Sequence, residues 1–126
     1  MDETKTYRGY RMQDRGVVEV ITDNGSGQKE YRELPLYLEI ENHSPSGVNW
    51  GYAGSGPSQL ALALLYDVTG KAEVALIAHQ GFKHDVIAKL PTEEDWQLTS
   101  IQIENWIEEL KVKVDGWIKD TMDPTA

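Results

Sequence analysis

The sequence contains no cysteine, which excludes a disulfide framework, a thiolate zinc site and a cysteine nucleophile. It also lacks any run of about 18 apolar residues, so we expect no transmembrane helix and no membrane partner. The first residues, MDETKTYRGY, are polar and lack the apolar segment of a secretory signal. Together these absences predict a cytoplasmic protein.

Basic residues are scarce, because 12 Lys and Arg stand against 21 Asp and Glu and give a net charge of −9. Such a chain is not expected to bind DNA or RNA directly, since phosphate neutralisation needs clustered Lys and Arg. The charge is uneven: residues 1–46 carry a net −3, residues 47–90 carry 0 and residues 91–126 carry −6. An anionic small molecule would therefore meet the least repulsion in the middle of the chain.

The length of 126 residues fits a single domain over 1–126, with residues 1–5 and 121–126 expected to be frayed. The first part of the chain has β character, and VVEVIT is its clearest strand because it is rich in β-branched residues. Turn residues punctuate this part at 13–16 and 23–27. The pattern predicts an antiparallel meander with strands at 6–12, 17–22, 28–34 and 36–40.

Helices are expected after the long irregular segment 42–56. The first follows Pro57, with Ser55 or Gly56 as cap and Gln59 at the place of a capping-box partner. A second helical region covers 71–89, and a third begins with the capping box of Thr99 and Gln102. The third carries one apolar stripe of Ile103, Trp106, Ile107, Leu110, Val114 and Trp117. The predicted fold is α+β, a small antiparallel sheet of about four strands packed against about three helices.

The stretch NWGYAGSGPSQLALALL, residues 49–65, is the candidate ligand site. Its glycines would let backbone N–H groups approach a ligand, and a helix N-terminus favours anions. Trp50 and Tyr52 offer flat faces for stacking, and Lys83 could reach an anion held by the loop. The predicted ligand-binding residues are Asn42, His43, Ser44, Trp50, Tyr52, Gly54, Ser55, Gly56, Gln59 and Lys83.

The same glycines have a second interpretation. A phosphate-binding Walker loop needs Gly-Lys-Ser/Thr, but Gly56 is followed by Pro57, and the dinucleotide spacing G-x-G-x-x-G is also missing. A Gly-Pro turn that lets a buried helix pack tightly would account for the glycines and the proline without any ligand. Both interpretations stay open at the level of sequence.

Three segments together resemble a family of small bacterial and phage proteins known as a domain of unknown function. They are YRGY, NHSPSGVNWGYAGSGPSQLALALL and FKHDVIAKLP, and the resemblance extends over roughly residues 6 to 110. It implies no reaction, substrate or cofactor. It singles out Asn42, His43, Ser44, Trp50, Gly51, Tyr52, Gly54, Ser55, Gly56, Gln59, Phe82 and Lys83.

No metal site and no cofactor are predicted. His79 and His84 are five residues apart, about 140° around a helix, and so cannot share a metal as an i, i+4 pair would. Ser55 between glycines suggests a hydrolase nucleophile, but the G-x-S-x-G elbow is absent and no partner acid is evident. No catalytic residues are therefore assigned.

The leading hypothesis is a non-catalytic binding protein for a phosphate-containing, nucleotide-derived small molecule. In a phage this could be a sponge that sequesters an antiviral defence signal in the cytoplasm of the bacterial host cell. A homo-oligomer would suit it, because a site between subunits encloses more ligand surface. One alternative is an acidic, nucleic-acid-mimicking inhibitor of a host enzyme, acting through Glu93, Glu94, Asp95, Glu104, Glu108 and Glu109. The other is a small hydrolase or transferase that uses His43 and Ser55.

Overall fold

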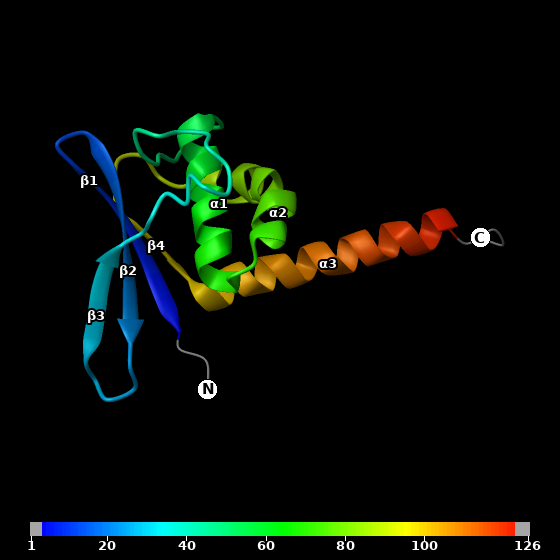
Figure 1. Cartoon of the computed structure of the whole chain (residues 1–126), viewed down its shortest axis with the longest axis horizontal. Coiled ribbons are helices and arrows are strands. Elements are labelled where there is room, and N and C mark those ends of the chain that lie inside the picture. The colour runs from blue at the N-terminus through cyan, green and yellow to red at the C-terminus, as the bar shows by residue number, and fades with distance from the viewer. Residues whose placement is uncertain (1–3, 123–126) are drawn as a thin grey trace.

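A four-stranded antiparallel sheet and a layer of helices make up the computed structural model, which describes residues 4–122 (Figure 1). The strands are β1 (Lys5–Met12), β2 (Arg15–Asp23), β3 (Lys29–Glu33) and β4 (Trp96–Thr99). The helices are α1 (Ser55–Thr69), α2 (Ala72–Asp85) and α3 (Ser100–Met122), with a short 3-10 turn at Ile87–Lys89. The predicted α+β class is confirmed.

The sheet has the order β3-β2-β1-β4, so the strand nearest the N-terminus lies inside it. The hairpin β1–β2 closes at Gln13 and Asp14, both with positive φ, as a two-residue hairpin turn requires. The fourth strand differs from the prediction. Residues 36–40 form no strand; Tyr37–Ile40 form a turn, in which Ile40 N–H donates to the Tyr37 carbonyl oxygen and Tyr37 has φ 55°. Pro35 lies just before this turn and has no N–H to continue the β3 ladder.

Helix α1 forms the centre of the molecule, between the sheet and α2 (Figure 1). Every residue from Gly56 to Leu65 is buried. The all-round apolar run Leu60–Tyr66 predicts this burial for its part of the helix, and of that run only Tyr66 is partly exposed. Helix α3 begins beside α1 and then runs away from the domain (Figure 1). Its capping box is confirmed, since Thr99 N–H donates to Gln102 Oε1 and Gln102 N–H donates to Thr99 Oγ1.

The predicted stripe of α3 is buried only near its beginning. Ile103 and Ile107 are buried, Trp106 and Leu110 are half-buried, and Val114 is exposed because the helix has left the domain by then. The side chain of Trp117 lies outside the described residues. The predicted fraying of residues 1–5 and 121–126 stays a prediction. β1 begins at Lys5 and α3 is described as far as Met122, and residues 1–3 and 123–126 lie outside the described residues.

The carboxylate of Asp67 joins α1 to the sheet. It accepts hydrogen bonds from the hydroxyls of Tyr7 and Tyr37, both at 2.7 Å, and from the Arg32 guanidinium at 2.9 and 3.0 Å. The Lys5 ammonium lies 3.4 Å away. The carboxylate is only 2% exposed, so these donors compensate its loss of water. We call these five residues the Asp67 cluster and assign it a structural role.

Gly9 provides a first test of the sheet. It pairs with Trp96 across β1 and β4, and a methyl group at this position would overlap the indole ring. We therefore expect Gly9→Ala to lower the free energy of unfolding by about 2 kcal/mol in urea denaturation, as overpacking does elsewhere. Gly81→Ala on the exposed side of α2 is the matched control, and it should stabilise the chain by roughly 0.8 kcal/mol. A neutral or stabilising Gly9→Ala would contradict the β1–β4 register.

Within residues 4–122, none of the helices combines the length and apolarity that a membrane span needs.

Candidate functional site

Residues 34–54 connect β3 to α1, and the side chain of Gln59 holds this loop in place. Gln59 Oε1 accepts hydrogen bonds from the backbone N–H of His43 (2.7 Å) and Ser44 (3.0 Å). Its amide nitrogen donates to the carbonyl oxygens of Leu36 (2.7 Å) and Glu41 (3.1 Å). The residue is fully buried, so one side chain satisfies four polar groups of the loop.

The beginning of α1 differs from the predicted cap. Gly54 is the N-cap, with extended backbone and no side-chain hydrogen bond, so neither Ser55 nor Gly56 caps the helix. Gln59 lies beneath the loop instead of completing a capping box. Pro57 has no N–H, so the amides of Ser55 and Gly56 are the donors at this positive helix end.

Close packing explains the glycines of the motif. A Cβ on Gly54 would lie 2.6 Å from the Tyr52 ring, and one on Gly56 would lie 2.8 Å from Asn49 Cβ. Gly51 has φ 88° and packs against Thr92. These contacts agree with the tight-turn interpretation, so the glycines alone do not indicate a ligand.

A hollow of about 340 Å³ nevertheless lies at the beginning of α1, between the loop and the β1–β2 turn. We call it the polar hollow. Four of the predicted site residues line it: Ser44, Tyr52, Ser55 and Gly56. The others are Asp14, Arg15, Gly16, Ser46, Gly47, Val48 and Asn49.

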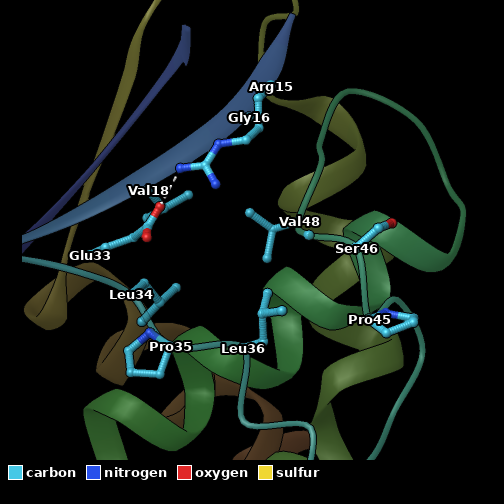
Figure 2. Close-up of a pocket in the computed structure, with 11 residues that line it drawn as sticks. Arg15, Gly16, Val18, Glu33, Leu34, Pro35, Leu36, Pro45, Ser46 and Val48 are labelled. Carbon is cyan, nitrogen blue, oxygen red and sulfur yellow. Dashed lines mark hydrogen bonds and ion pairs between the residues drawn. The ribbon is translucent and has the colours of Figure 1, made fainter.

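A second hollow, also about 340 Å³, adjoins the first and shares Arg15, Gly16 and residues 46–48 with it. We call it the apolar hollow. Figure 2 shows its lining, with side chains from the loop, β2 and the end of β3 around one space. The apolar members are Val18, Leu34, Pro35, Leu36, Pro45 and Val48. At its edge the Arg15 guanidinium donates to Glu33 Oε1 at 2.8 Å (Figure 2).

The structure places Trp50 in the core and not on the lining of either hollow. Trp50 is only 1% exposed and packs edge-on against Trp96, with ring centroids 5.3 Å apart. The Arg11 guanidinium covers its ring at 4.5 Å and also donates to Asn49 Oδ1. Tyr52, at 48% exposed, is the motif aromatic that a ligand can reach.

His43 contacts a different part of the chain from the polar hollow. Its Nε2 lies 3.0 Å from His79 Nε2 and 3.0 Å from Glu41 Oε1. Lys83 is on α2 and Asn42 is exposed on the loop; no hydrogen bond or ion pair among residues 4–122 joins either to the hollow. The structure therefore does not bring Lys83 to the anion position that the sequence predicts.

The structure also describes the residues of the two alternative functions, the acidic inhibitor and the hydrolase or transferase. The six candidate acidic residues are all exposed, but Asp95 pairs with Arg8 at 2.9 Å and Glu108 pairs with Lys111 at 3.2 Å. For a hydrolase, no hydrogen bond within the described part of the chain joins His43 to Ser55. Both alternatives stay predictions.

Sequence reasoning missed Arg15, Arg11 and the entire apolar hollow. Arg15 reaches the site because the β1–β2 turn folds against the loop, which no spacing in the sequence reveals. The link between His43 and His79, 36 residues apart, is equally tertiary. The apolar sequence LPL at residues 34–36 was the one signal for the apolar hollow, but such a sequence resembles a strand.

The fold and site define a small α+β domain in which a buried glutamine holds a loop over a two-part surface hollow. The chain belongs to the family of unknown function DUF6166, whose model matches residues 7–109. The match includes the loop, both hollows and His79. No curated protein and no solved structure matches the chain.

Proposed function

We infer that the chain is a non-catalytic binding protein for a phosphate-containing, nucleotide-derived small molecule. The observation that carries this proposal is the pairing of the two hollows around Arg15. A nucleotide combines an anionic group with a flat, largely apolar ring. The polar hollow offers polar groups, and the adjoining hollow has a mixed lining that includes six apolar side chains. Their combined size also falls in the range of small-molecule sites.

The anionic group fits the polar hollow. The amides of Ser55 and Gly56 lie at the positive end of α1, and the Ser44 and Ser46 side chains add hydrogen-bonding groups. Arg15 supplies a charge that suits phosphate geometry. Asp14 lines the same hollow and opposes an anion, which gives a way to test the charge argument.

The ring of the ligand fits the apolar hollow or the exposed face of Tyr52. In the apolar hollow, Leu34 is buried and Val48 and Leu36 are half-buried. A ring that enters this hollow would therefore cover apolar surface. The biological form we favour is sequestration of a nucleotide signal by a phage protein in the bacterial cytoplasm, which requires tight binding without turnover. A second copy of the chain over the hollows would enclose the ligand further.

A thermal-shift screen tests the proposal, with ADP-ribose and its cyclic forms, NAD, cyclic di- and trinucleotides, mononucleotides and inorganic phosphate. A ligand at about 100 times its dissociation constant should stabilise the chain by roughly 2.7 kcal/mol. We expect Arg15→Ala and Tyr52→Ala to weaken the hit about tenfold or more, and Asp14→Asn to strengthen it. Tyr31→Ala, which removes an exposed tyrosine from β3, is the control and should bind normally.

Two results would contradict this function. One is a screen in which no compound raises the melting temperature. The other is a hit whose affinity is the same in wild type, Arg15→Ala and Tyr52→Ala, because that ligand would bind elsewhere.

A further inference from the structure

Three metal-ligating side chains meet where the loop contacts α2. Glu41 and His43 come from the loop, and His79 comes from α2. One ligand atom from each lies within 4.8 Å of the other two. His43 Nε2 is 3.0 Å from both His79 Nε2 and Glu41 Oε1.

The hydrogen bonds of His79 determine which of its nitrogens can accept. Its Nδ1 lies 2.9 Å from the Ala75 carbonyl oxygen and 3.0 Å from that of Leu76. Carbonyl oxygens only accept, so Nδ1 carries the proton of the neutral ring and Nε2 carries the lone pair. A backbone carbonyl on the far ring nitrogen is the usual partner of a metal-bound histidine.

A bound cation would change how these acceptors are satisfied. In their neutral and ionised forms, the His79 nitrogen and the Glu41 carboxylate both present lone pairs, and a proton on His43 Nε2 can be directed fully at only one of them. Gln80 Nε2 lies 3.2 Å from His79 Nε2 and donates to it, and a cation would displace this bond. A single divalent ion would satisfy all three acceptors at once.

We propose that Glu41, His43 and His79 form a zinc-binding site that joins the loop to α2. Two imidazoles and one carboxylate are a ligand set that zinc accepts, and zinc prefers four ligands in a tetrahedron. Tetrahedral ligands about 2.0–2.1 Å from zinc lie about 3.3 Å apart. The two separations of 3.0 Å from His43 Nε2 are close to this value, and the separation of the His79 and Glu41 ligand atoms is within 4.8 Å. This proposed zinc site is separate from the polar and apolar hollows that we propose for the nucleotide.

Exposure indicates how the fourth position is filled. His79 is 3% exposed, whereas the side chains of His43 and Glu41 are 22% and 40% exposed. The site therefore has a buried wall on α2 and an open side toward solvent, where a water molecule can complete the coordination. Three protein ligands with one open position is the arrangement of zinc sites that exchange or activate a bound molecule.

The test is titration of chelator-treated full-length protein with Zn²⁺ at neutral pH, followed by calorimetry and thermal melting. We expect one Zn²⁺ per chain and a higher melting temperature. Co²⁺ should give the intense visible absorption of a four-coordinate ion. His43→Ala and Glu41→Gln should each weaken Zn²⁺ binding by about 100-fold or more. Mutating a residue that only hydrogen-bonds to a metal ligand already lowers metal affinity by about 10–100-fold, and these two changes remove a ligand itself.

Matched variants separate this site from surface binding. His84→Ala removes an exposed histidine from the same helix, and Glu39→Gln removes an exposed carboxylate two residues before Glu41; both should bind Zn²⁺ as the wild type does. Circular dichroism establishes that each variant is folded. Failure of the wild type to bind Zn²⁺, or equal binding by folded His43→Ala and Glu41→Gln, would overturn the proposal.

Discussion

Gln59→Leu is expected to lower the free energy of unfolding by about 4–5 kcal/mol. The substitution removes two hydrogen bonds to the N–H groups of His43 and Ser44 and two to the carbonyls of Leu36 and Glu41. Each bond contributes about 1 kcal/mol net, and buried groups left without a partner cost about 1–3 kcal/mol each. Because part of the loop is reached by water, we expect the lower part of the summed range. Chemical denaturation measures the change.

The controls for Gln59 distinguish its donor and acceptor roles. Gln59→Glu keeps an acceptor for His43 and Ser44 but turns a carboxylate oxygen toward two carbonyls, so it should also destabilise the chain. Gln102→Ala removes a glutamine from the exposed capping box of α3 and should cost about 1 kcal/mol. If Gln59→Leu unfolds at the same denaturant concentration as Gln102→Ala, the loop does not depend on this side chain.

Asp67→Asn is the second large effect, with an expected loss of about 3 kcal/mol. The carboxylate is buried and faces two cations and two tyrosine hydroxyls, and removing one partner of a buried ion pair typically costs 3–5 kcal/mol. The lower end applies because the side chains of Arg32 and Lys5 are 44% and 27% exposed, so water screens them. Asp95→Asn, in the exposed pair with Arg8, should change stability by less than about 1 kcal/mol.

The acid side of the stability profile depends on the same carboxylate. Burial alone would raise the pKa of Asp67, but hydrogen bonds from Tyr37, Tyr7 and Arg32 and the charge of Lys5 outweigh it and hold the pKa below its ordinary 3.8. The unfolded chain therefore binds this proton at a higher pH than the folded chain. The stabilisation from Asp67 is complete above about pH 4 and is lost as the pH falls through the lower, folded value. Asp67→Asn should flatten this acid decline in denaturation measured against pH.

At alkaline pH, stability is expected to change in the opposite direction and to fall as the pH rises. Burial, followed by the Asp67 hydrogen bond, raises the pKa of Tyr37 from 10.0 to about 12, and burial raises the pKa of Tyr7 further. The unfolded chain loses these protons first, so stability should fall as the pH rises from about 10 toward 12. Tyr37→Phe should reduce this decline, and a profile that is flat above pH 10 in the wild type would contradict the assignment.

The elements with strong local signals could be predicted from the sequence. The β-branched run of β2, the turn residues at 23–27 and the Thr99–Gln102 capping box encode their structures within a few residues. The fourth strand could not be found this way. Leu36 and Ile40 have strand-like alternation, but Pro35 and the positive φ of Tyr37 produce a turn, whereas the short β4 depends on pairing with distant β1.

The site was predictable only in part, because its residues act through tertiary contacts. Of the residues that the motif singled out, Ser44, Tyr52, Ser55 and Gly56 line one hollow. The burial of Trp50 depends on Trp96 and Arg11, which are distant in sequence. The position of Gln59 on α1 suggested a cap, but its carboxamide faces the loop, and only the packed structure shows the four groups that it satisfies.

The position of β4 beside β1 also determines when this chain can complete its fold. Lys5 N–H donates to Ser100 Oγ across 95 positions of sequence, and the four residues of β4 cover the outer edge of β1. On a ribosome, β1 to β3 emerge first, and the outer edge of β1 stays unpaired until the segment before α3 has been made. An uncovered strand edge can pair with another chain. Until β4 pairs with it, the outer edge of β1 is therefore open to pairing with another newly made copy.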